Sequence, residues 1–154
     1  MLDLKKIPSN IGHYIAGFAD GQASFMVIFR PRKDYKNNWK ISLAFNISQK
    51  DPTILSLIKR YLKCGILRQR KDGVWYYEVN NMNSIEQNII PFFTKYGFLS
   101  SKKKTEFSNF KRIFKILKKD ILTIDDIKEI LRLRKKINSR IKYSDDEILK
   151  TWKA

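Results

Sequence analysis

Basic, amide and hydroxyl side chains recur at alternate positions of four predicted β-strands. These positions are Arg30, Arg32, Lys40, Ser42, Asn46, Ser48, Arg68, Arg70, Tyr76, Glu78 and Asn80, which we call the polar sheet face. Such side chains form hydrogen bonds with phosphate oxygens and with base edges, and a β-ribbon fits the major groove of DNA. A solvated sheet face usually carries charges of both signs, whereas this set contains one carboxylate, Glu78. We predict a nucleic-acid-binding face and keep an ordinary solvated face as the alternative.

The overall charge indicates the same class of partner. The chain of 154 residues has 32 Lys and Arg against 15 Asp and Glu, a formal net charge of +17. A charge of this size attracts polyanions. Nucleic acid is the first candidate, an anionic membrane surface the second, and a merely soluble basic surface the third. Lys102, Lys103 and Lys104 open a predicted amphipathic helix and favour phosphate contacts there.

Any metal chemistry must use oxygen ligands. The single Cys64 and the single His13 exclude an internal disulfide and a Cys/His zinc site. Two acidic groups, at 125–126 and 145–147, lie at predicted helix starts, where carboxylates interact favourably with the positive end of the helix dipole. We therefore assign these acids to helix starts and not to a nuclease centre.

The order of elements predicts an α+β fold. A helix over about 11–19, capped by Asn10 or Ser9, is followed by strands over 23–32 and 39–49, the second with apolar residues at every other position. Asp51 and Pro52 open the next helix. Asp72 and Gly73 predict a hairpin turn between strands over 65–70 and 74–80.

Helices are then predicted over about 84–93, 101–118 and 123–137, with a short one from Ser144. Pro and Gly are scarce, so no linker divides the chain. We expect one domain over 1–154, with a core over about 10–118 and a helical extension over 119–154. An antiparallel sheet with helices stacked on one face is the expected arrangement.

The sequence also bears on location. It lacks the roughly 20-residue apolar run of a membrane span and the apolar core of a signal peptide, so we expect an intracellular protein without membrane contact. Abundant Lys, Asn, Ile and Phe favour an AT-rich genome, and with it an organellar origin in a mitochondrion or plastid.

The segment from Ile15 to Phe25, IAGFADGQASF, resembles the signature helix of the LAGLIDADG homing endonuclease family. The order helix, hairpin, helix, hairpin, helices is similar to that of the family, and the segment from Phe98 to Lys104 is similar to its downstream basic segment. The resemblance covers about 10–117. It implies an αββαββα core whose antiparallel sheet is a DNA-binding saddle with helices on the other face. It also implies an intron-encoded enzyme that cuts both strands of a specific duplex.

The resemblance further implies a homodimer, because a chain with one motif is similar to the homodimeric members. Their motif helices pack side by side at the two-fold axis. The corresponding interface residues are Ile15, Ala16, Gly17, Phe18, Asp20 and Gly21. From the residues alone, packing within one chain explains the glycines equally well. A two-fold dimer would bind a long pseudo-palindromic double-stranded DNA site.

The metal position departs from the family pattern. In the family, the acidic residue that closes the motif and a nearby backbone carbonyl hold a divalent cation, usually Mg²⁺, at the scissile phosphate. Here that position is Gln22, beside the carbonyl of Gly21, whereas Asp20 resembles the structural aspartate of the family. An amide offers one neutral oxygen, so we expect poor Mg²⁺ binding.

This departure predicts that the chain is a cleavage-defective form. The corresponding active endonuclease would have an acid at position 22 in place of Gln22. Such a form would bind DNA without cutting it. Replacement of Mg²⁺ by Ca²⁺ would likewise allow binding without cleavage. A natural binder or splicing cofactor that has lost its acid is the alternative.

Two further positions carry over from the resemblance. Gln49 matches the family's polar residue near the attacking water, and Lys102 matches the basic residue that steadies the scissile phosphate. A strand-end glutamine and a surface lysine are the alternatives for these two residues.

A rival function on the same fold is an intron-splicing maturase that binds intron RNA. We favour DNA, because the major groove of A-form RNA is too deep and narrow to admit a sheet. A DNA-binding regulator that never had a nuclease site is the third hypothesis.

Overall fold

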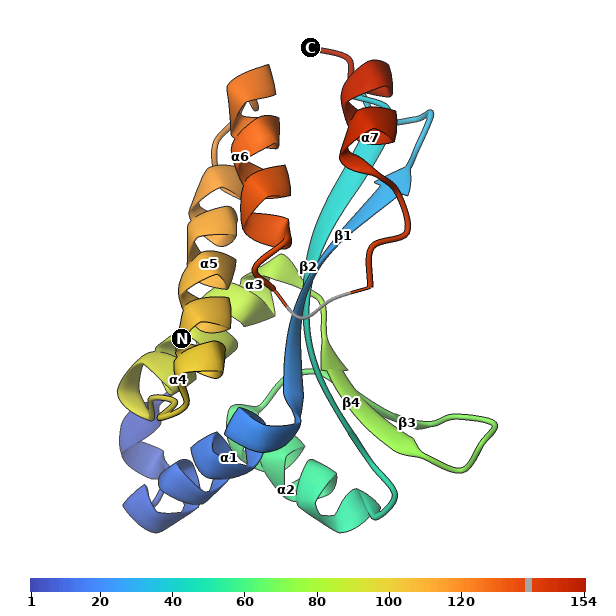
Figure 1. The fold of residues 1–154 in the computed structure, drawn as a ribbon. Coiled ribbons are helices and arrows are strands. Elements are labelled where there is room, and N and C mark those ends of the chain that lie inside the picture. Colours follow the sequence, from blue (N-terminus) through green and yellow to red (C-terminus); the bar gives the residue numbers. More distant parts are fainter. Residues whose placement is uncertain (138–139) are drawn as a thin grey trace. The chain divides into compact units, whose positions relative to one another are not determined.

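The computed structural model describes residues 1–137 and 140–154 and shows a four-stranded sheet with helices (Figure 1). The strands are β1 (Ala23–Pro31), β2 (Trp39–Gln49), β3 (Ile66–Gln69) and β4 (Trp75–Val79), hydrogen-bonded in the order β1-β2-β4-β3. The predicted α+β class is confirmed. The chain forms two compact units, the first made of Met1–Ser24 and Ala44–Lys104 and the second of Phe25–Leu43 and Thr105–Ala154.

The first unit contains all the described helices before residue 100. They are η1 (Leu4–Lys6), α1 (Ser9–Gln22), α2 (Pro52–Leu62), α3 (Met82–Ser84), a π-helical turn (Ile85–Ile89) and α4 (Ile90–Lys95). An aromatic cluster forms its core: Phe93 lies 5.2 Å from Phe45 and 4.8 Å from Phe98 between ring centroids. Phe92 and Tyr77 are fully buried beside them. The helix predicted over 84–93 is observed as a continuous helical segment over 82–95, which is longer at both ends and includes the π-helical turn.

The start of α1 differs from its prediction. Neither Asn10 nor Ser9 caps the helix, because the helix begins at Ser9 and the preceding Pro8 is extended, with no side-chain cap. The N–H of Gly12 donates to the carbonyl of Pro8 at 2.9 Å. A Cβ atom on Gly12 would lie 2.3 Å from the Tyr96 ring, so this glycine is needed for packing within the chain.

Strand β4 pairs antiparallel with both β2 and β3. Phe45, Ile47 and Tyr77 on one face are fully buried. The other face carries Ser48 opposite Tyr76, and Tyr76 opposite Arg68. The alternation read from the sequence therefore places apolar and polar residues on opposite faces of these strands, as expected for a sheet with one buried face.

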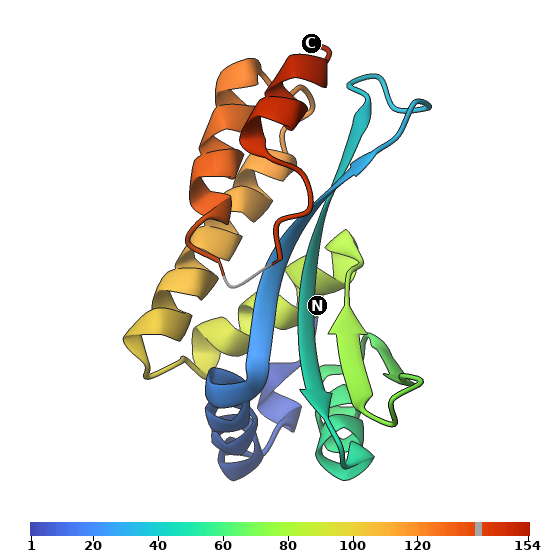
Figure 2. The same cartoon turned by 45° about the vertical axis from the view of Figure 1, so that its right-hand side comes forward.

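The second unit contains nearly all of β1, the first half of β2 and three helices. Helices α5 (Ser101–Leu117) and α6 (Ile124–Arg134) form a helical hairpin that both views show (Figures 1 and 2), and α7 (Asp145–Thr151) follows. Phe25 packs 4.8 Å from Phe110 between ring centroids. Thr123 and Asp126 form a capping box, which confirms that the acid at 126 stabilises a helix start.

The C-terminal residues of the second unit are hydrogen-bonded to the loop between β1 and β2. The Trp39 indole Nε1 donates to Thr151 Oγ1 at 2.9 Å, and Asn38 Nδ2 donates to the Thr151 carbonyl at 3.0 Å. Asn37 Nδ2 donates to the Lys153 carbonyl, and the Lys153 N–H returns a bond of 3.2 Å to Asn37. Asn38 has a φ of 71°, a left-handed conformation that asparagine tolerates. These bonds hold one end of the β1–β2 hairpin.

Within the described ranges, every helix is too short or too polar to cross a membrane.

Candidate nucleic-acid interface

The polar sheet face of the first unit forms two rows across three strands. Ser48, Tyr76 and Arg68 are neighbours in one row, and Asn46 lies opposite Glu78 in the next. Tyr76 and Glu78 are half-buried, whereas Arg68 is exposed. The rows present a guanidinium, a phenol and amide groups side by side, a mixture that can bind both phosphates and base edges.

The remaining polar residues of this hairpin have partners within it. Asn80 Nδ2 donates to Glu78 Oε1 at 3.0 Å, so the one carboxylate of the set is already hydrogen-bonded. Arg70 lies just beyond β3 and its guanidinium is 3.4 Å from Asp72 of the turn. This exposed ion pair is weak, and leaves Arg70 able to exchange partners.

The second unit carries the other four predicted contact residues. Arg30 is exposed, and Lys40 and Ser42 are half-buried. Arg32 lies beyond the end of β1 and forms an ion pair of 2.6 Å with Asp34. The hydrogen bond from Arg32 lowers the pKa of the Asp34 carboxyl. The charge of Arg32 is therefore partly offset in the free chain.

Asp20 joins the end of α1 to the start of α5. Its Oδ2 accepts from the N–H of Leu99 at 2.8 Å and of Ser100 at 3.0 Å, and its Oδ1 accepts from the Ser100 hydroxyl. Partial burial acts to raise the pKa of Asp20, but the hydrogen bonds from Ser100 and Leu99, with the charge of Lys103, hold it below its ordinary value. Asp20 is thus engaged in the fold of the first unit.

Ser100 is the residue that sequence reasoning missed at this point. Its Oγ also accepts from the Lys103 N–H at 3.2 Å, which caps the first turn of α5. A serine immediately before a helix is a recognised capping signal. The pairing of that serine with Asp20, 80 residues away, has no local sequence signal.

Lys103 contradicts its prediction as a DNA contact. It is 5% exposed, and its Nζ donates to the backbone carbonyl of Ala23. The reason is the helical position, which turns this lysine toward the chain while Lys102 and Lys104 remain exposed. Ala23 directly follows Gln22, and Lys102 directly precedes Lys103. The bond therefore brings the backbone of Gln22 and the exposed Lys102 into one neighbourhood.

Gln49 lies at the end of β2, opposite Trp75. It belongs to the same strand parity as the buried Ile47, and not to the polar sheet face. Its Oε1 accepts from the N–H of Lys50 at 3.3 Å. Gln49 is the last residue of β2, and its side chain is half-buried. Since only its Oε1 is engaged, its amide N–H groups can donate to another partner.

Gly21 and Gln22 end α1 and are both exposed. As oxygen donors they offer one backbone carbonyl and one neutral side-chain amide. The nearest acid in sequence, Asp20, already accepts three hydrogen bonds. Among the described residues, no group of three or more Asp, Glu, His or Cys could hold a metal. This donor set does not fit Mg²⁺, which prefers carboxylate and water oxygens in an octahedron.

An open groove of about 760 Å³ runs along one face of α1. It is lined by Ala16, Gly17, Gly21 and Leu99, among others, and Leu99 is 86% exposed. A Cβ atom on Gly17 or Gly21 would meet no described atom within 4 Å. Of the other predicted interface residues, Phe18 is half-buried, but Ile15 is fully buried in the chain. Ile15 therefore belongs to the core and not to an exposed face, because it lies on the inner side of α1.

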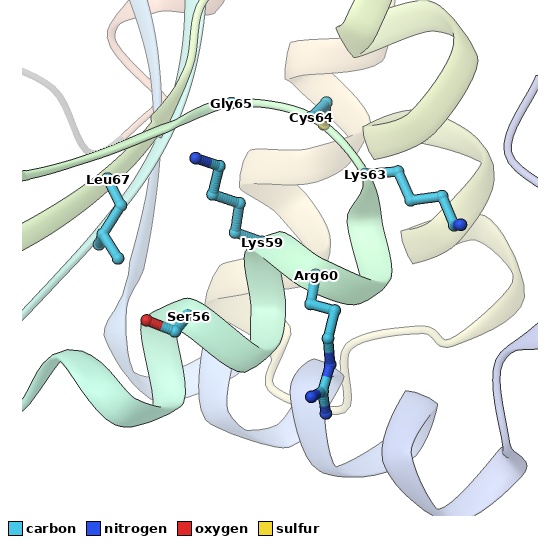
Figure 3. Close-up of a pocket in the computed structure, with 7 residues that line it drawn as sticks. All are labelled: Ser56, Lys59, Arg60, Lys63, Cys64, Gly65 and Leu67. Atoms are coloured by element: carbon cyan, nitrogen blue, oxygen red, sulfur yellow. The ribbon is translucent and has the colours of Figure 1, made fainter.

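A separate basic pocket lies where α2 ends and β3 begins (Figure 3). Lys59, Arg60 and Lys63 line it together with Cys64. Their charged ends point in three different directions. They do not converge on one point, so this pocket is not a built site for a ligand.

The family of the chain follows from its sequence and fold together. The model of the LAGLIDADG endonuclease family matches residues 15–114. This match covers the C-terminal half of α1, the whole sheet and most of α5. The chain belongs to this family.

Particular relatives agree with this assignment. The chain is 31% identical over 130 residues to the probable intron-encoded endonuclease 2 of Neurospora crassa, which covers 81% of this chain and 28% of that relative. Its fold matches I-SmaMI bound to uncleaveable DNA with a TM-score of 0.77 and 30% identity, over 84% of this chain and 45% of that chain. It also matches I-TnaI with a TM-score of 0.78 and 22% identity, over 91% and 94%. The chain thus spans less than a third of the fungal relative and less than half of I-SmaMI.

Proposed function

We propose that this chain is a site-specific double-stranded DNA-binding domain of a homing endonuclease, in a form that Gln22 makes cleavage-defective. The observation that carries the proposal is the family match, which begins within α1, whose last residues, Gly21 and Gln22, are exposed beside the start of α5. The polar rows of the sheet, with Arg68 and Asn46, supply the contacts to bases and phosphates. The resemblance to I-SmaMI solved with DNA supports this choice of partner.

The proposal includes a division of roles at the end of α1. Asp20 holds the fold, Gln22 occupies the position where the family has its acid, and Lys102 faces the scissile phosphate with an exposed ammonium group. Gln49 orients water with its free amide donors. Each role is supported by the exposure of the side chain or by its hydrogen bonds. Mg²⁺ in enzymes is usually held by one or two carboxylates together with water and phosphate oxygens, so this proposal makes cleavage depend on a carboxylate at position 22.

Reversion of Gln22→Glu tests this point. We expect the reverted protein to cut both strands of its bound duplex in Mg²⁺ and to bind without cutting in Ca²⁺. Gln69→Glu is the matched control, because it makes the same chemical change at an exposed strand position outside the proposed centre. A reverted protein that binds its site and cuts nothing would show that Gln22 is not the cause of inactivity. Cutting by the unaltered protein would refute the claim of a defective form.

A homodimer is the assembly we propose. Gly17 and Gly21 leave the groove face of α1 open, and Tyr14 and Leu99 are exposed on the same unit. I-SmaMI is more than twice as long as the part of it that this chain covers, which fits a requirement for two copies of the fold. Sedimentation at equilibrium should give twice the mass of the chain, and Gly17→Leu should give a folded monomer. A wild-type monomer both with and without its duplex would exclude the homodimer.

The target is a long pseudo-palindromic duplex, which selection from a random duplex library in Ca²⁺ can identify. An enriched two-fold site supports the proposal, whereas binding that is indifferent to sequence contradicts it. Competition by structured intron RNA tests the maturase alternative, because RNA that displaced the selected duplex at equal concentration would favour splicing. An intron-encoded, organellar origin is supported by the names of relatives, among them an intron-encoded protein of Neurospora crassa and a cox1 intron protein of Schizosaccharomyces pombe.

A further inference from the structure

A cavity of about 490 Å³ lies beside β1 in the second unit, outside the proposed cleavage centre. Five cationic side chains line it: Arg30 near the end of β1, Arg32 just beyond it, Arg134 from α6, and Arg140 and Lys142 from the segment before α7. Three of these five come from beyond residue 114, where the family match ends. Nothing in the family assignment accounts for them.

The cavity has an excess of positive charge. Within its lining, Arg32 is paired with Asp34 at 2.6 Å and Arg134 with Asp145 at 2.6 Å. Asp145 also contacts Lys135, at 3.2 Å. In residues 1–137 and 140–154, no carboxylate forms an ion pair with Arg30, Arg140 or Lys142. Three cations therefore remain for an external anion.

Arg134 is the feature that separates this cavity from an ordinary basic surface. Its side chain is 4% exposed, and its Nε is buried without a hydrogen-bond partner. The guanidinium carbon lies over the Phe29 ring, 5.3 Å from its centroid. A buried donor without an acceptor is unfavourable, because it has lost its hydrogen bonds to water. An anion in the cavity can supply the acceptor.

The position of β1 indicates which anion this is. β1 has a single neighbour, β2, in the strand order, so it forms one edge of the sheet. Neighbouring strands are about 4.8 Å apart and the DNA major groove is about 12 Å wide. A ribbon of two strands therefore fills the groove and brings its edge against the sugar-phosphate backbone.

We propose that this cavity binds a backbone phosphate of the DNA duplex, with Arg140 and Lys142 as contact residues and Arg134 as the buried donor. The inference rests on the proposed function, because it requires a duplex on the sheet. It adds a contact from the C-terminal segment to those of the strands. Guanidinium groups form paired hydrogen bonds with phosphate oxygens, which suits the predominance of Arg here.

The salt dependence of binding to a 30-base-pair duplex tests the occupant. The double variant Arg140→Gln with Lys142→Gln should lower the slope of log affinity against log salt by about 0.9 for each phosphate that the protein no longer neutralises. The matched control, Lys115→Gln with Lys128→Gln, removes the same charge from exposed positions away from the cavity and should leave the slope unchanged. The variant Arg68→Gln, measured in the same way, tests whether the duplex binds on the sheet, because it should lower the affinity for DNA.

A second measurement tests the site without DNA. In ¹H–¹⁵N NMR spectra, addition of inorganic phosphate should shift the Arg134 Nε–H resonance saturably, and the double variant should weaken this binding about tenfold. Absence of the shift in the folded protein would overturn the site. If phosphate shifted the Arg134 resonance but the double variant had the same salt slope for DNA binding as the wild type, the duplex would not be the occupant of the cavity. If Arg68→Gln and the double variant both left DNA affinity unchanged, the proposed function would fail, and a phosphate shift would then assign the cavity to a free anion.

Discussion

Asp20 and Ser100 form a doubly hydrogen-bonded pair, in which Ser100 donates both its backbone N–H and its hydroxyl to the Asp20 carboxylate. The pair joins the end of α1 to the first turn of α5. The chain thereby fixes the backbone two residues before the exposed Gln22 and two residues before the exposed Lys102, with a group that takes no part in the proposed chemistry.

Replacement of Asp20→Asn should lower the free energy of unfolding by about 1 kcal/mol at pH 7, because the hydrogen bonds lose their charged acceptor. The lowered pKa of Asp20 means that its charged form stabilises the fold. That contribution is full above the unfolded-state pKa, near pH 4, and is lost as pH falls through the lower folded-state pKa. Urea titrations at pH 7 and pH 3 should show the difference between wild type and variant shrinking with acidity. Asp120→Asn, at an exposed loop position, should cost little at either pH.

Gly12→Ala should destabilise the chain by about 1–3 kcal/mol, although alanine favours helices by about 1 kcal/mol. The new Cβ would lie 2.3–2.6 Å from atoms of the Tyr96 ring. Gly17→Ala on the same helix is the control, since its Cβ would meet nothing within 4 Å. Urea unfolding at low protein concentration should therefore rank Gly17→Ala at or above wild type. An equal loss in both variants would refute the packing explanation.

Gly65→Ala should cost more than Gly73→Ala. Both glycines have positive φ, 88° and 87°, which costs an L-residue about 1–2 kcal/mol. A Cβ on Gly65 would in addition lie 2.7 Å from the Tyr77 ring and 2.9 Å from the Glu78 carbonyl, whereas Gly73 has open space. We expect a further loss of about 1–3 kcal/mol at position 65, measured by thermal or urea unfolding. Equal losses would show that the backbone conformation alone matters.

Thr151→Val should destabilise the second unit by about 1–2 kcal/mol. The Trp39 indole donates to Thr151 Oγ1, and Trp39 is 6% exposed, so valine would leave a buried donor unpaired. Hydrogen exchange of the Asn38 and Lys153 amides should accelerate in the variant. Thr105→Val, at an exposed position of α5, is the matched control. Unchanged exchange would indicate that the β1–β2 loop is held by other contacts.

The sequence predicted the strands well, because the alternation of apolar and polar residues reports directly which face is buried. In β2, Trp39, Leu43, Phe45 and Ile47 are buried as that pattern requires, whereas Ile41 of the same set is half-buried. Helix starts with a local signal, such as Asp51 before Pro52, were also correct. The start of α1 was wrong because a serine and an asparagine both favour caps, while the extended Pro8 decides the boundary.

Contacts between distant residues account for what sequence could not predict. Lys103 reads as one of three adjacent lysines, and nothing local shows that its amine is used by the Ala23 carbonyl. Arg134 likewise reads as an ordinary basic residue at a helix end, yet it is buried against Phe29 and Asp145. The burial and the partners of such side chains depend on packing between distant segments, and a single sequence does not show which segments lie together.

The bonds between the C-terminal residues and the β1–β2 loop also limit when this end of the hairpin can fold. Trp39 and Thr151 are separated by 112 positions, so this end of the hairpin cannot be completed until the ribosome has released the segment that follows α6. Contacts of such long separation slow folding, because the chain must close a large loop before they form. Within residues 1–154, the outer ends of the strands that carry Arg30 and Lys40 should therefore be among the last parts to become ordered.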